Sequence, residues 1–333
     1  MSISCHVSGL GSYTPPQVLT NKDLESRVET TDAWVQERTG IKSRHSLSAE
    51  ECPTDLAFEA AKQALATAGL APADLTHIIL GTCSPEYLCP SGACIVAQKL
   101  GIEQSVMAFD LNAACSGFLY AMDVARGLIT TTPGSRILII GSESLTRRIN
   151  WQDRGTCVLF GDGAGAAVVT ADTLPGEGPR AVLDDVLCQS DGRQWPMLTL
   201  GGATLRRYEP GLNTLDDDFF IQMSGREVFK SAVRNMAKIA NEVLERNGLT
   251  LADIDLLVPH QANMRIIEAV RDRLGMDPAK TYVNIETMGN TSAASIPLAL
   301  TQAWSEGALK PGMRVLLVTF GGGFTWAAAL LRF

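Results

Sequence analysis

The 333-residue chain lacks the features that mark nucleic-acid-binding and membrane proteins. It carries 28 Lys and Arg against 36 Asp and Glu, a formal net charge of −8, whereas a nucleic-acid surface needs clustered basic residues that displace counterions. No apolar run reaches the roughly 18 residues of a membrane span, and the start MSISCHVSGLGSY has no basic region followed by an apolar one. We therefore expect a soluble, cytoplasmic protein that binds neither nucleic acid nor membrane.

The eight cysteines show neither a disulfide framework nor the spacing of a metal site. The chain is long and has no visible export signal, so reduced thiols are expected. Cys83, Cys89 and Cys94 are the most closely spaced, but they form no CxxC pair, and the nearest histidine, His77, falls in a predicted strand. The sequence therefore predicts no metal site.

Three stretches of the first half of the sequence recur in the same order in the second half. The first is an amphipathic helical pattern closed by a glycine, followed by a short turn and an apolar run of strand length. The paired stretches are GLAPADLTHIIL (69–80) with GLTLADIDLLV (248–258), PGSRILIIG (133–141) with PGMRVLLVT (311–319), and FGDGAGAAVV (160–169) with FGGGFTWAAALL (320–331). Three matches in register indicate an internal duplication.

The duplicated pattern predicts a layered α/β fold. Apolar runs such as ILII and VLLV, bounded by turns and alternating with helices, are typical of central strands buried on both faces. Two equivalent halves, 1–170 and 223–333, would stack helix and sheet layers, with the active site where the halves meet. Residues 171–222, rich in Gly, Pro and Asp, match neither half, and we expect them to form an inserted cap or surface excursion.

Three polar residues lie where predicted strands end or predicted helices begin. Cys115, in FDLNAACSGFLYAMDVARGLI, precedes a helix that starts near Ser116, so the positive end of the helix dipole favours a thiolate. His260 follows the strand DLLVP, and Asn290 lies in MGNTSAAS before an apolar helix. Each also has a structural interpretation: a buried core cysteine, a capping or structural histidine, and an N-cap or turn asparagine.

Two glycine-rich stretches call for different interpretations. Gly321, Gly322 and Gly323 form either a tight turn or a stretch of backbone that can approach a ligand without interference from a Cβ. GDGAG at 161–165 loosely resembles a phosphate loop, but it lacks the P-loop lysine and the Rossmann context. We therefore predict no nucleotide cofactor.

Taken together, AACSGF, PHQAN, GNTSAAS and FGGGFTW resemble the β-ketoacyl-acyl carrier protein (ACP) synthase III family of the thiolase superfamily. TTDAWVQERTGI (30–41), DRGT (153–156) and FGDGAGAA (160–167) agree as well, and the resemblance spans nearly the whole chain. It implies a thiolase-like fold with five layers, α-β-α-β-α, built from two duplicated halves.

The resemblance implies a decarboxylative Claisen condensation that initiates fatty acid synthesis. Cys115 matches the nucleophile, which takes the acyl group of a short acyl-CoA, acetyl-CoA by default. His260 and Asn290 match the pair that serves decarboxylation and condensation with malonyl-ACP, and the backbone N–H groups of Cys115 and the Gly321–Gly323 loop are expected to hold the oxyanion. The implied product is 3-oxoacyl-ACP; acyl-CoA and malonyl-ACP are substrates, and no cofactor is implied.

The family pattern also implies binding positions for the two carriers and the acyl chain. The residues that match CoA-binding positions at the tunnel mouth are Thr30, Trp34, Arg38, Arg154 and Asn263. Those that match the docking surface for ACP are Gln261, Ala262, Asn263, Met264 and Arg265. Cys89 and Phe320 match acyl-pocket positions; many relatives carry a larger residue where this chain has Cys89, so the choice of primer stays open, as does the effect of 171–222 on the acyl tunnel. A homodimer is implied by the family alone.

Two other interpretations are kept. A specialised synthase of the same family, working in secondary metabolism, would use the same residues on another primer. A noncatalytic homologue would keep the fold and bind acyl carriers without turnover. A degradative thiolase is disfavoured, because it would be expected to use a second cysteine near its C-terminus and FGGGFTW contains none.

Overall fold

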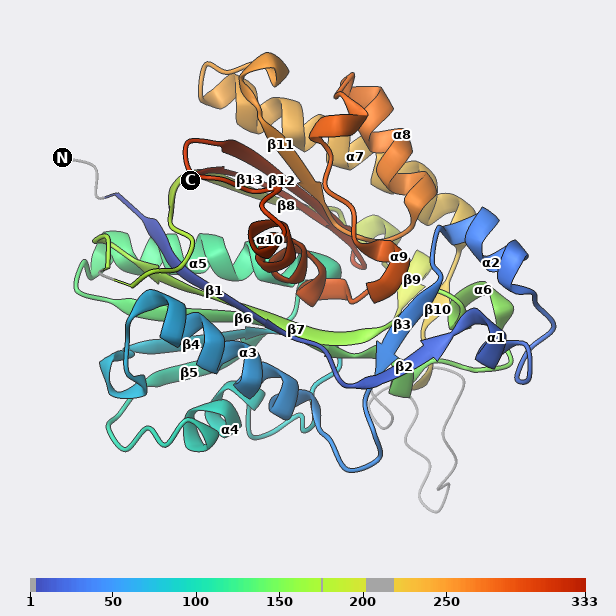
Figure 1. The fold of residues 1–333 in the computed structure, drawn as a ribbon, viewed down its shortest axis with the longest axis horizontal. Coiled ribbons are helices and arrows are strands. Elements are labelled where there is room, and N and C mark those ends of the chain that lie inside the picture. The colour runs from blue at the N-terminus through green and yellow to red at the C-terminus, as the bar shows by residue number, and fades with distance from the viewer. Residues whose placement is uncertain (1–3, 175, 202–218) are drawn as a thin grey trace.

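A sheet system of nine strands runs through the computed structural model, which describes residues 4–174, 176–201 and 219–333 (Figure 1). Its strand order is β11-β12-β13-β8-β1-β7-β6-β4-β5. The strands on the N-terminal side are β1 (His6–Tyr13), β4 (His77–Gly81), β5 (Met107–Leu111), β6 (Arg136–Ser144) and β7 (Asp162–Thr170). Those on the C-terminal side are β8 (Ala181–Ser190), β11 (Leu256–Pro259), β12 (Arg314–Gly321) and β13 (Thr325–Arg332).

The two sides of the sheet system repeat the same strand pairings. On the N-terminal side β7 is antiparallel to β1 and β6, β4 is parallel to β6, and β5 is parallel to β4. On the C-terminal side β13 is antiparallel to β8 and β12, and β11 is parallel to β12. Thr281 forms an isolated parallel bridge with Leu257 of β11, in the place that β5 takes on the other side. The duplication predicted from the sequence is confirmed by these pairings.

The expected start of the second half needs one correction. Residues 181–190 were expected to belong to an insertion at 171–222, but they form β8, which pairs with β13. β8 is therefore the counterpart of β1, and two residue pairs between β8 and β1 join the half-sheets. The Gly, Pro and Asp content of the surrounding segment obscured this strand. Residues 202–218 of the same segment lie outside the described residues.

Helices cover both outer faces of the half-sheets and fill the space between them (Figure 1). The longer helices are α3 (Pro53–Ala68), α4 (Gly92–Lys99), α5 (Gly117–Thr131), α7 (Gly225–Arg246), α8 (Met264–Leu274) and α10 (Ser295–Ser305). α3 and α4 pack on the N-terminal half-sheet, α7 packs on the C-terminal half-sheet with α8 beside it, and α5 and α10 contact both half-sheets from between them. The five-layer order α-β-α-β-α predicted by the resemblance is confirmed.

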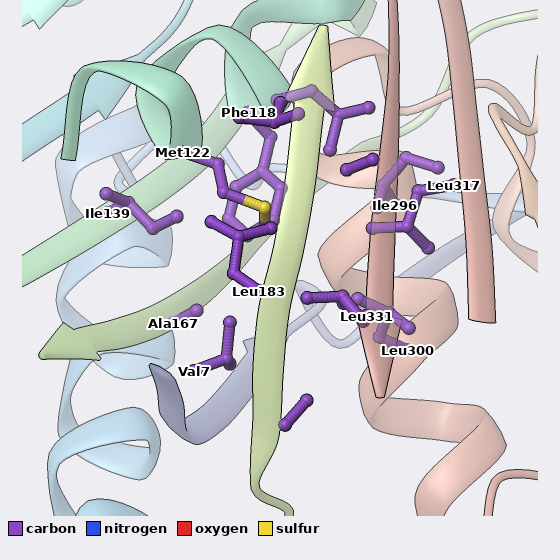
Figure 2. Close-up of a cluster of buried hydrophobic side chains, with 14 of the residues drawn as sticks. Val7, Phe118, Met122, Ile139, Ala167, Leu183, Ile296, Leu300, Leu317 and Leu331 are labelled. Atoms are coloured by element: carbon purple, nitrogen blue, oxygen red, sulfur yellow. The ribbon is translucent and has the colours of Figure 1, made fainter. Parts of the chain in front are cut away.

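A large apolar core surrounds the two inner helices (Figure 2). Phe118 of α5 and Ile296 of α10 are each 1% exposed, and they pack among strand residues such as Ile139, Leu183 and Leu317. Burial of side chains of this size stabilises the fold by about 1.5–3 kcal/mol each. Because this core holds α5 and α10 together, the short 3₁₀ turns that precede them also contact each other.

The repeated helix–turn–strand unit has the same physical basis in both halves. α3 ends at Gly69 in the left-handed conformation with φ of 70°, and Gly248 after α7 has φ of 65°. In the 3₁₀ turn that follows each helix, a carboxylate accepts a backbone N–H three residues earlier: Asp74 from Ala71 at 2.9 Å, and Asp253 from Thr250 at 2.8 Å. The matching glycine and aspartate in the two sequence copies therefore build matching turns into β4 and β11.

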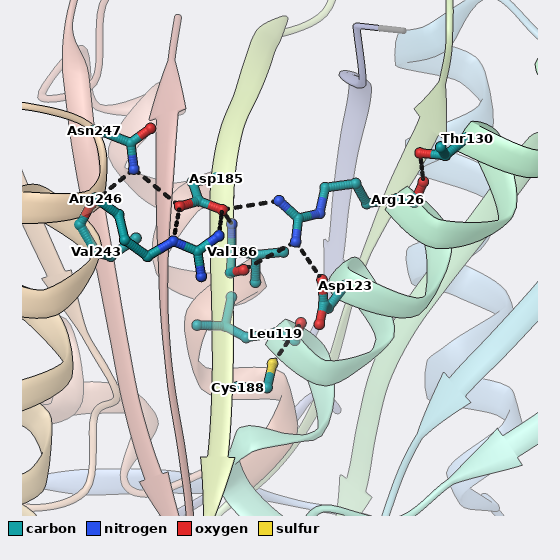
Figure 3. A network of polar contacts seen from close by, with 10 residues as sticks. All are labelled: Leu119, Asp123, Arg126, Thr130, Asp185, Val186, Cys188, Val243, Arg246 and Asn247. Carbon is teal, nitrogen blue, oxygen red and sulfur yellow. Dashed lines mark hydrogen bonds and ion pairs between the residues drawn. The ribbon is translucent and has the colours of Figure 1, made fainter. Parts of the chain in front are cut away.

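A buried carboxylate links three layers at the seam between the half-sheets (Figure 3). Asp185 of β8 bonds Arg126 of the inner helix α5 at 2.9 Å and lies 3.3 Å from Arg246 of the outer helix α7. Asn247 donates to the same carboxylate at 2.9 Å, and Arg126 also pairs with Asp123 at 2.9 Å. The paired charges offset the cost of burying this carboxylate, and the network fixes α5 relative to α7.

The shorter elements gather at one end of the sheet system, at the right of Figure 1. They are α1 (Asn21–Leu24), α2 (Asp32–Thr39), α6 (Arg154–Cys157), α9 (Ile285–Met288), the paired strands β2 (Gln17–Thr20) and β3 (Ser43–Ser46), and the paired strands β9 (Leu198–Thr199) and β10 (Gln222–Met223). Of the helices in the described residues, none is long and apolar enough to cross a membrane.

Candidate active site

Cys115 lies on a tight turn between β5 and α5. A 3₁₀ turn over Ala114–Ser116 directly precedes the helix, and Ala114 adopts a left-handed conformation with φ of 47°. The Oδ1 atom of Asn112 accepts the N–H of Ala114 at 3.1 Å and holds the turn. Left-handed conformations of non-glycine residues are costly and cluster at functional sites. The turn leaves Cys115 at the N-terminal end of α5, as predicted, and 9% exposed.

The turn before α10 repeats this arrangement. Ser292 is left-handed with φ of 49°, and the Oδ1 atom of Asn290 accepts its N–H at 2.9 Å. Asn112 and Asn290 therefore hold equivalent places in NAACS and NTSAA, a fourth repeated pair that sequence comparison missed because only the asparagine is identical. Since the two turns contact each other, the duplication itself brings Cys115 and Asn290 together.

The C-terminal end of β12 passes directly against the cysteine turn. A Cβ on Gly321 would lie 2.6 Å from the backbone nitrogen of Cys115, so only glycine fits this close approach. Two hydroxyl groups hold the cysteine turn against β12 and β13. Thr319 donates to Ser116 Oγ at 3.1 Å, and Thr325 donates to the Ala113 carbonyl at 2.8 Å. The glycine stretch thus lets two backbone segments meet beside the sulfur.

His260 follows the last residue of β11 and is 2% exposed. Its N–H donates to the Val318 carbonyl at 2.8 Å, and its ring Nδ1 lies 2.6 Å from the hydroxyl oxygen of Ser295, the first residue of α10. Burial lowers the pKa of His260 to about 3, so the ring is neutral at physiological pH. Ser295 had not been singled out in the sequence; it is the residue that orients this imidazole.

Cys115, His260 and Asn290 line one cavity of about 940 Å³. A large part of the wall is apolar, including Leu198, Leu200, Ile221, Val228, Met236 and Phe320. The cations in the lining are Arg38, Arg154, Arg226, Lys230 and Arg265, and no Asp or Glu lines the cavity among the described residues. In a chain of net charge −8, this concentration of positive charge favours an anionic ligand.

The residues matched to CoA-binding positions gather at this cavity, with one exception. The guanidinium carbons of Arg154 and Arg38 lie 4.7 and 6.0 Å from the ring centre of Trp34, and all three residues line the cavity. Asn263 also lines it and donates to the Arg38 carbonyl at 3.2 Å. Thr30 does not line the cavity; its hydroxyl is buried and has no hydrogen-bond partner within the described part of the chain.

The residues matched to the ACP surface separate into two groups. Arg265 is exposed and lines the cavity rim, as does Ala262 in part, while the half-buried Met264 packs against Gly40 after α2. Gln261 is only 1% exposed: its amide donates to the Pro259 carbonyl and accepts backbone N–H groups from the start of α9. The expectation that Gln261 contacts ACP is therefore wrong for its side chain.

The two residues matched to the acyl pocket also differ in placement. Phe320 lines the cavity and is 4% exposed, packed 4.8 Å from the ring of Phe324. Cys89 is exposed and does not line the cavity. Cys83 lines the cavity instead, although its spacing from the other cysteines suggests no site. Part of 171–222 does reach the cavity, through the residues of β9, Leu200 and Ile221.

The thiol of Cys115 is more basic than its position at a helix end suggested. Burial raises the pKa of Cys115 to about 12, while contact with the Ser292 hydroxyl lowers it in part. The helix dipole acts in the same direction as Ser292 but is worth only about 0.3–2 kcal/mol. The resting site thus holds a protonated nucleophile, a neutral imidazole and a primary amide around an apolar, cation-rimmed cavity, which suits acyl transfer from an anionic carrier.

Comparison with known proteins gives the family. A model of 3-oxoacyl-ACP synthase III matches residues 109–192, and a model of its C-terminal part matches residues 244–333. The β-ketoacyl-ACP synthase III of Nitratidesulfovibrio vulgaris (strain DSM 19637 / Miyazaki F) is 57% identical over 331 residues, which cover 99% of this chain and 98% of the relative. The chain belongs to the β-ketoacyl-ACP synthase III family.

Solved structures of the family agree with the fold. The 3-oxoacyl-ACP synthase III of Aquifex aeolicus VF5 superposes with a TM-score of 0.90 at 43% identity, covering 99% of this chain and 100% of that one. The enzyme of Pseudomonas aeruginosa PAO1 gives a TM-score of 0.88 at 37% identity, with 99% and 98% covered. The predicted thiolase-like fold and the family are confirmed, and the chain is an acyltransferase that acts as a condensing enzyme.

Proposed function

We propose that this enzyme condenses a short acyl-CoA, acetyl-CoA by default, with malonyl-ACP to give a 3-oxoacyl-ACP two carbons longer, and so starts fatty acid chains. The observation that carries the proposal is the convergence of Cys115, His260 and Asn290 in one cavity with a cationic rim. Nucleophile, neutral imidazole and amide are the groups that acyl transfer and enolate stabilisation require.

In the first half-reaction the Cys115 sulfur attacks the thioester carbon of acyl-CoA. A carbon–sulfur bond to the enzyme forms, the bond to the CoA sulfur breaks, and CoA leaves as a thiol. The oxyanion of the tetrahedral intermediate takes hydrogen bonds from the backbone N–H of Cys115 and from the Gly321–Gly323 loop. A Cβ placed on Gly321 would lie only 2.6 Å from the Cys115 nitrogen, so the two backbone segments are adjacent. This proximity supports an oxyanion hole built from both segments.

In the second half-reaction His260 and Asn290 hold the enolate oxygen that forms when malonyl-ACP loses carbon dioxide. The Oδ1 atom of Asn290 is engaged by the N–H of Ser292 at 2.9 Å, which leaves its NH₂ group for the enolate. Nδ1 of His260 lies 2.6 Å from the Ser295 hydroxyl. With that hydroxyl as the donor, the ring proton is on Nε2, which then serves as the second donor to the enolate. The enolate carbon then attacks the acyl group on Cys115.

The cavity rim suits both carriers. Trp34, flanked by Arg38 and Arg154, offers an aromatic face and two guanidinium groups to the adenine and phosphates of CoA. Asn263 would contact the pantetheine arm. Arg265, exposed at the start of α8, would meet the acidic surface of ACP, and Ala262 and Met264 flank that contact.

We also propose that the enzyme works as a cytoplasmic homodimer. β5 is the outermost strand of the N-terminal half-sheet, so one of its edges is open among the described residues. Met107 at its start is 52% exposed, and Tyr87 and Leu88 are 55% and 74% exposed. An open edge together with apolar surface favours pairing with a second copy. Light scattering at micromolar concentration should report twice the chain mass, and a monomer would contradict the proposal.

A panel of acyl-CoA primers, each assayed with malonyl-ACP and with malonyl-CoA, tests the function. We expect acetyl-CoA and malonyl-ACP to give the highest kcat/KM, and Arg265→Glu to raise KM for malonyl-ACP much more than KM for malonyl-CoA. A strong preference for malonyl-CoA would overturn fatty-acid initiation. A long or branched primer as the best substrate would favour a specialised synthase, and acyl-CoA binding without turnover would favour a noncatalytic homologue.

A further inference from the structure

A completely buried carboxylate lies near the candidate nucleophile, Cys115. Glu143, near the end of β6, is 0% exposed. It accepts the backbone N–H groups of Cys83 and Ser84 at 3.2 and 3.1 Å, the Ser84 hydroxyl at 2.5 Å and the Ser292 hydroxyl at 3.0 Å. No Lys or Arg within the described residues forms an ion pair with it. A buried carboxylate held by neutral donors alone is costly, and such groups are often functional.

Ser292 connects this carboxylate to the cavity. Its hydroxyl donates to Glu143 at 3.0 Å and lies 4.0 Å from the Cys83 sulfur. Ser292 lines the same cavity as Cys115, and the turns that carry these two residues contact each other. Its left-handed φ of 49° and the bond from its N–H to Asn290 set this placement. A hydroxyl has one proton and two lone pairs, so it can receive a proton on one side while giving its own on the other.

The first half-reaction requires such a path. Burial raises the pKa of Cys115 to about 12, so the thiol keeps its proton at neutral pH and must lose it during attack. In the proposed function His260 and Asn290 act as donors to the enolate of the second half-reaction. Neither residue, in that role, supplies an acceptor for the thiol proton in the first half-reaction.

We propose that Ser292 is a catalytic residue of the acyl-transfer half-reaction and that Glu143 acts through it as a positioning residue that holds the thiol proton. As the Cys115 sulfur bonds to the thioester carbon, its proton passes to the Ser292 oxygen, and the Ser292 proton passes to the Glu143 carboxylate. When the bond to the CoA sulfur breaks, the proton passes back from Glu143 through Ser292 to the CoA sulfur, and CoA leaves as a thiol. The proposal rests on the proposed function of Cys115.

The surroundings of Glu143 agree with this role. Burial raises the pKa of Glu143, which makes it a stronger base than an exposed carboxylate. The titratable groups around it in the described chain are the thiols of Cys83 and Cys115, and the guanidinium of Arg148 interacts with Cys83. Both thiols are neutral at physiological pH, because burial raises the pKa of each.

The test compares Ser292→Ala and Ser292→Gly in the complete enzyme. Both remove the hydroxyl, and glycine also tolerates the left-handed backbone, so agreement between them isolates the hydroxyl from backbone strain. Ser142→Ala is the matched control: it removes another buried serine hydroxyl, which donates to Pro53 at 2.8 Å. Rapid-quench mass spectrometry measures acylation by acetyl-CoA from pH 6 to 9. Condensation is measured separately on enzyme that was acylated beforehand, and alkylation of Cys115 by iodoacetamide is followed over the same pH range.

We expect the rate of wild-type acylation to be nearly constant between about pH 6 and 8. Both Ser292 variants should acylate about a hundredfold more slowly at pH 7. Their rates should rise about tenfold per pH unit, because solvent hydroxide then accepts the thiol proton. Iodoacetamide alkylation should show the same change of profile, and condensation should stay within about threefold. Wild-type pH profiles in both Ser292 variants, or equal losses in both half-reactions, would overturn the proposal. If no acyl-CoA acylates the wild type, the proposed function fails, while alkylation still decides the relay.

Discussion

Replacement of Gly321 by alanine tests the claim that the glycine stretch exists to let backbone approach the nucleophile. The new Cβ would lie 2.6 Å from the Cys115 nitrogen and 3.2 Å from the Cβ atoms of Ala114 and Cys115. Ordinary contact begins at 3.4 Å, so the cysteine turn and β12 must separate by about 0.8 Å. The obstructing atom belongs to the backbone, and no side-chain rotation can relieve the clash.

The separation acts on catalysis more than on folding. Overpacking of this kind costs about 1–3 kcal/mol of stability. A displacement near 1 Å at a reacting group costs about a hundredfold in rate, which is about 2.7 kcal/mol in activation free energy. We therefore expect Gly321→Ala to lower the rate of Cys115 acylation by about a hundredfold while the protein still folds.

The assay is single-turnover acylation by acetyl-CoA, with thermal unfolding measured in parallel. Gly127→Ala is the matched control, because a Cβ on Gly127, exposed in the middle of α5, meets nothing within 4 Å. That variant should acylate at the wild-type rate and gain about 0.5–1 kcal/mol of stability. Wild-type acylation by Gly321→Ala would refute the steric argument, and so would an equal loss of activity in the Gly127 variant.

Three further regions give separate predictions. Ser295→Ala should slow condensation about tenfold and leave acylation unchanged in rapid-quench assays, because it releases the imidazole of His260. Since burial lowers the pKa of His260 to about 3, its contribution to stability is full above the unfolded value of 6.5 and is lost as pH falls towards 3. Urea unfolding should thus show about 2 kcal/mol less stability from this group at about pH 5 than at about pH 7.5, and His260→Gln should lack that part of the change. Trp34→Ala should raise KM for acyl-CoA about tenfold without changing kcat for a short acyl-pantetheine, as steady-state kinetics would show. Asp185→Asn should destabilise the fold by about 2 kcal/mol in thermal unfolding and leave kcat unchanged, since it weakens only the seam between layers.

Most of the fold was predicted from the internal duplication. Matching glycines and aspartates at the turns before β4 and β11 are local features, so comparison of the two halves of the sequence found both copies and predicted the layered architecture. β8 was not predicted as a strand, because a strand at a seam is specified by its partners, β13 and β1, which lie far away in the sequence.

The site was predicted less evenly. Cys115, His260 and Asn290 stood out because each follows or precedes a regular element, and the family motifs are centred on them. Glu143 lies in none of these motifs, and Ser295 is only the last residue of GNTSAAS. A buried acid within an apolar strand and a serine at a helix start acquire their roles only from the groups they face. The repeated asparagine before each inner helix was the one sequence signal that could have pointed to the second turn.

Sequence likewise could not separate surface from interior near the cavity. Gln261 lies in the same PHQAN motif as His260 but points into the protein, where it bonds four backbone groups. Cys89 lies in a loop whose placement depends on tertiary packing, and it is exposed and does not line the cavity.

The central claim is that the duplicated fold assembles Cys115 from one half with His260 and Asn290 from the other into a two-step condensing site. Intact-mass spectrometry after incubation with acetyl-CoA, followed by addition of malonyl-ACP, tests it most directly. We predict that wild type gains one acetyl group per chain and loses it to product, that Cys115→Ser gains none, and that His260→Ala gains the acetyl group but keeps it. Acetylation that persists in Cys115→Ser, or His260→Ala that releases its acetyl group to product at the wild-type rate, would contradict the account.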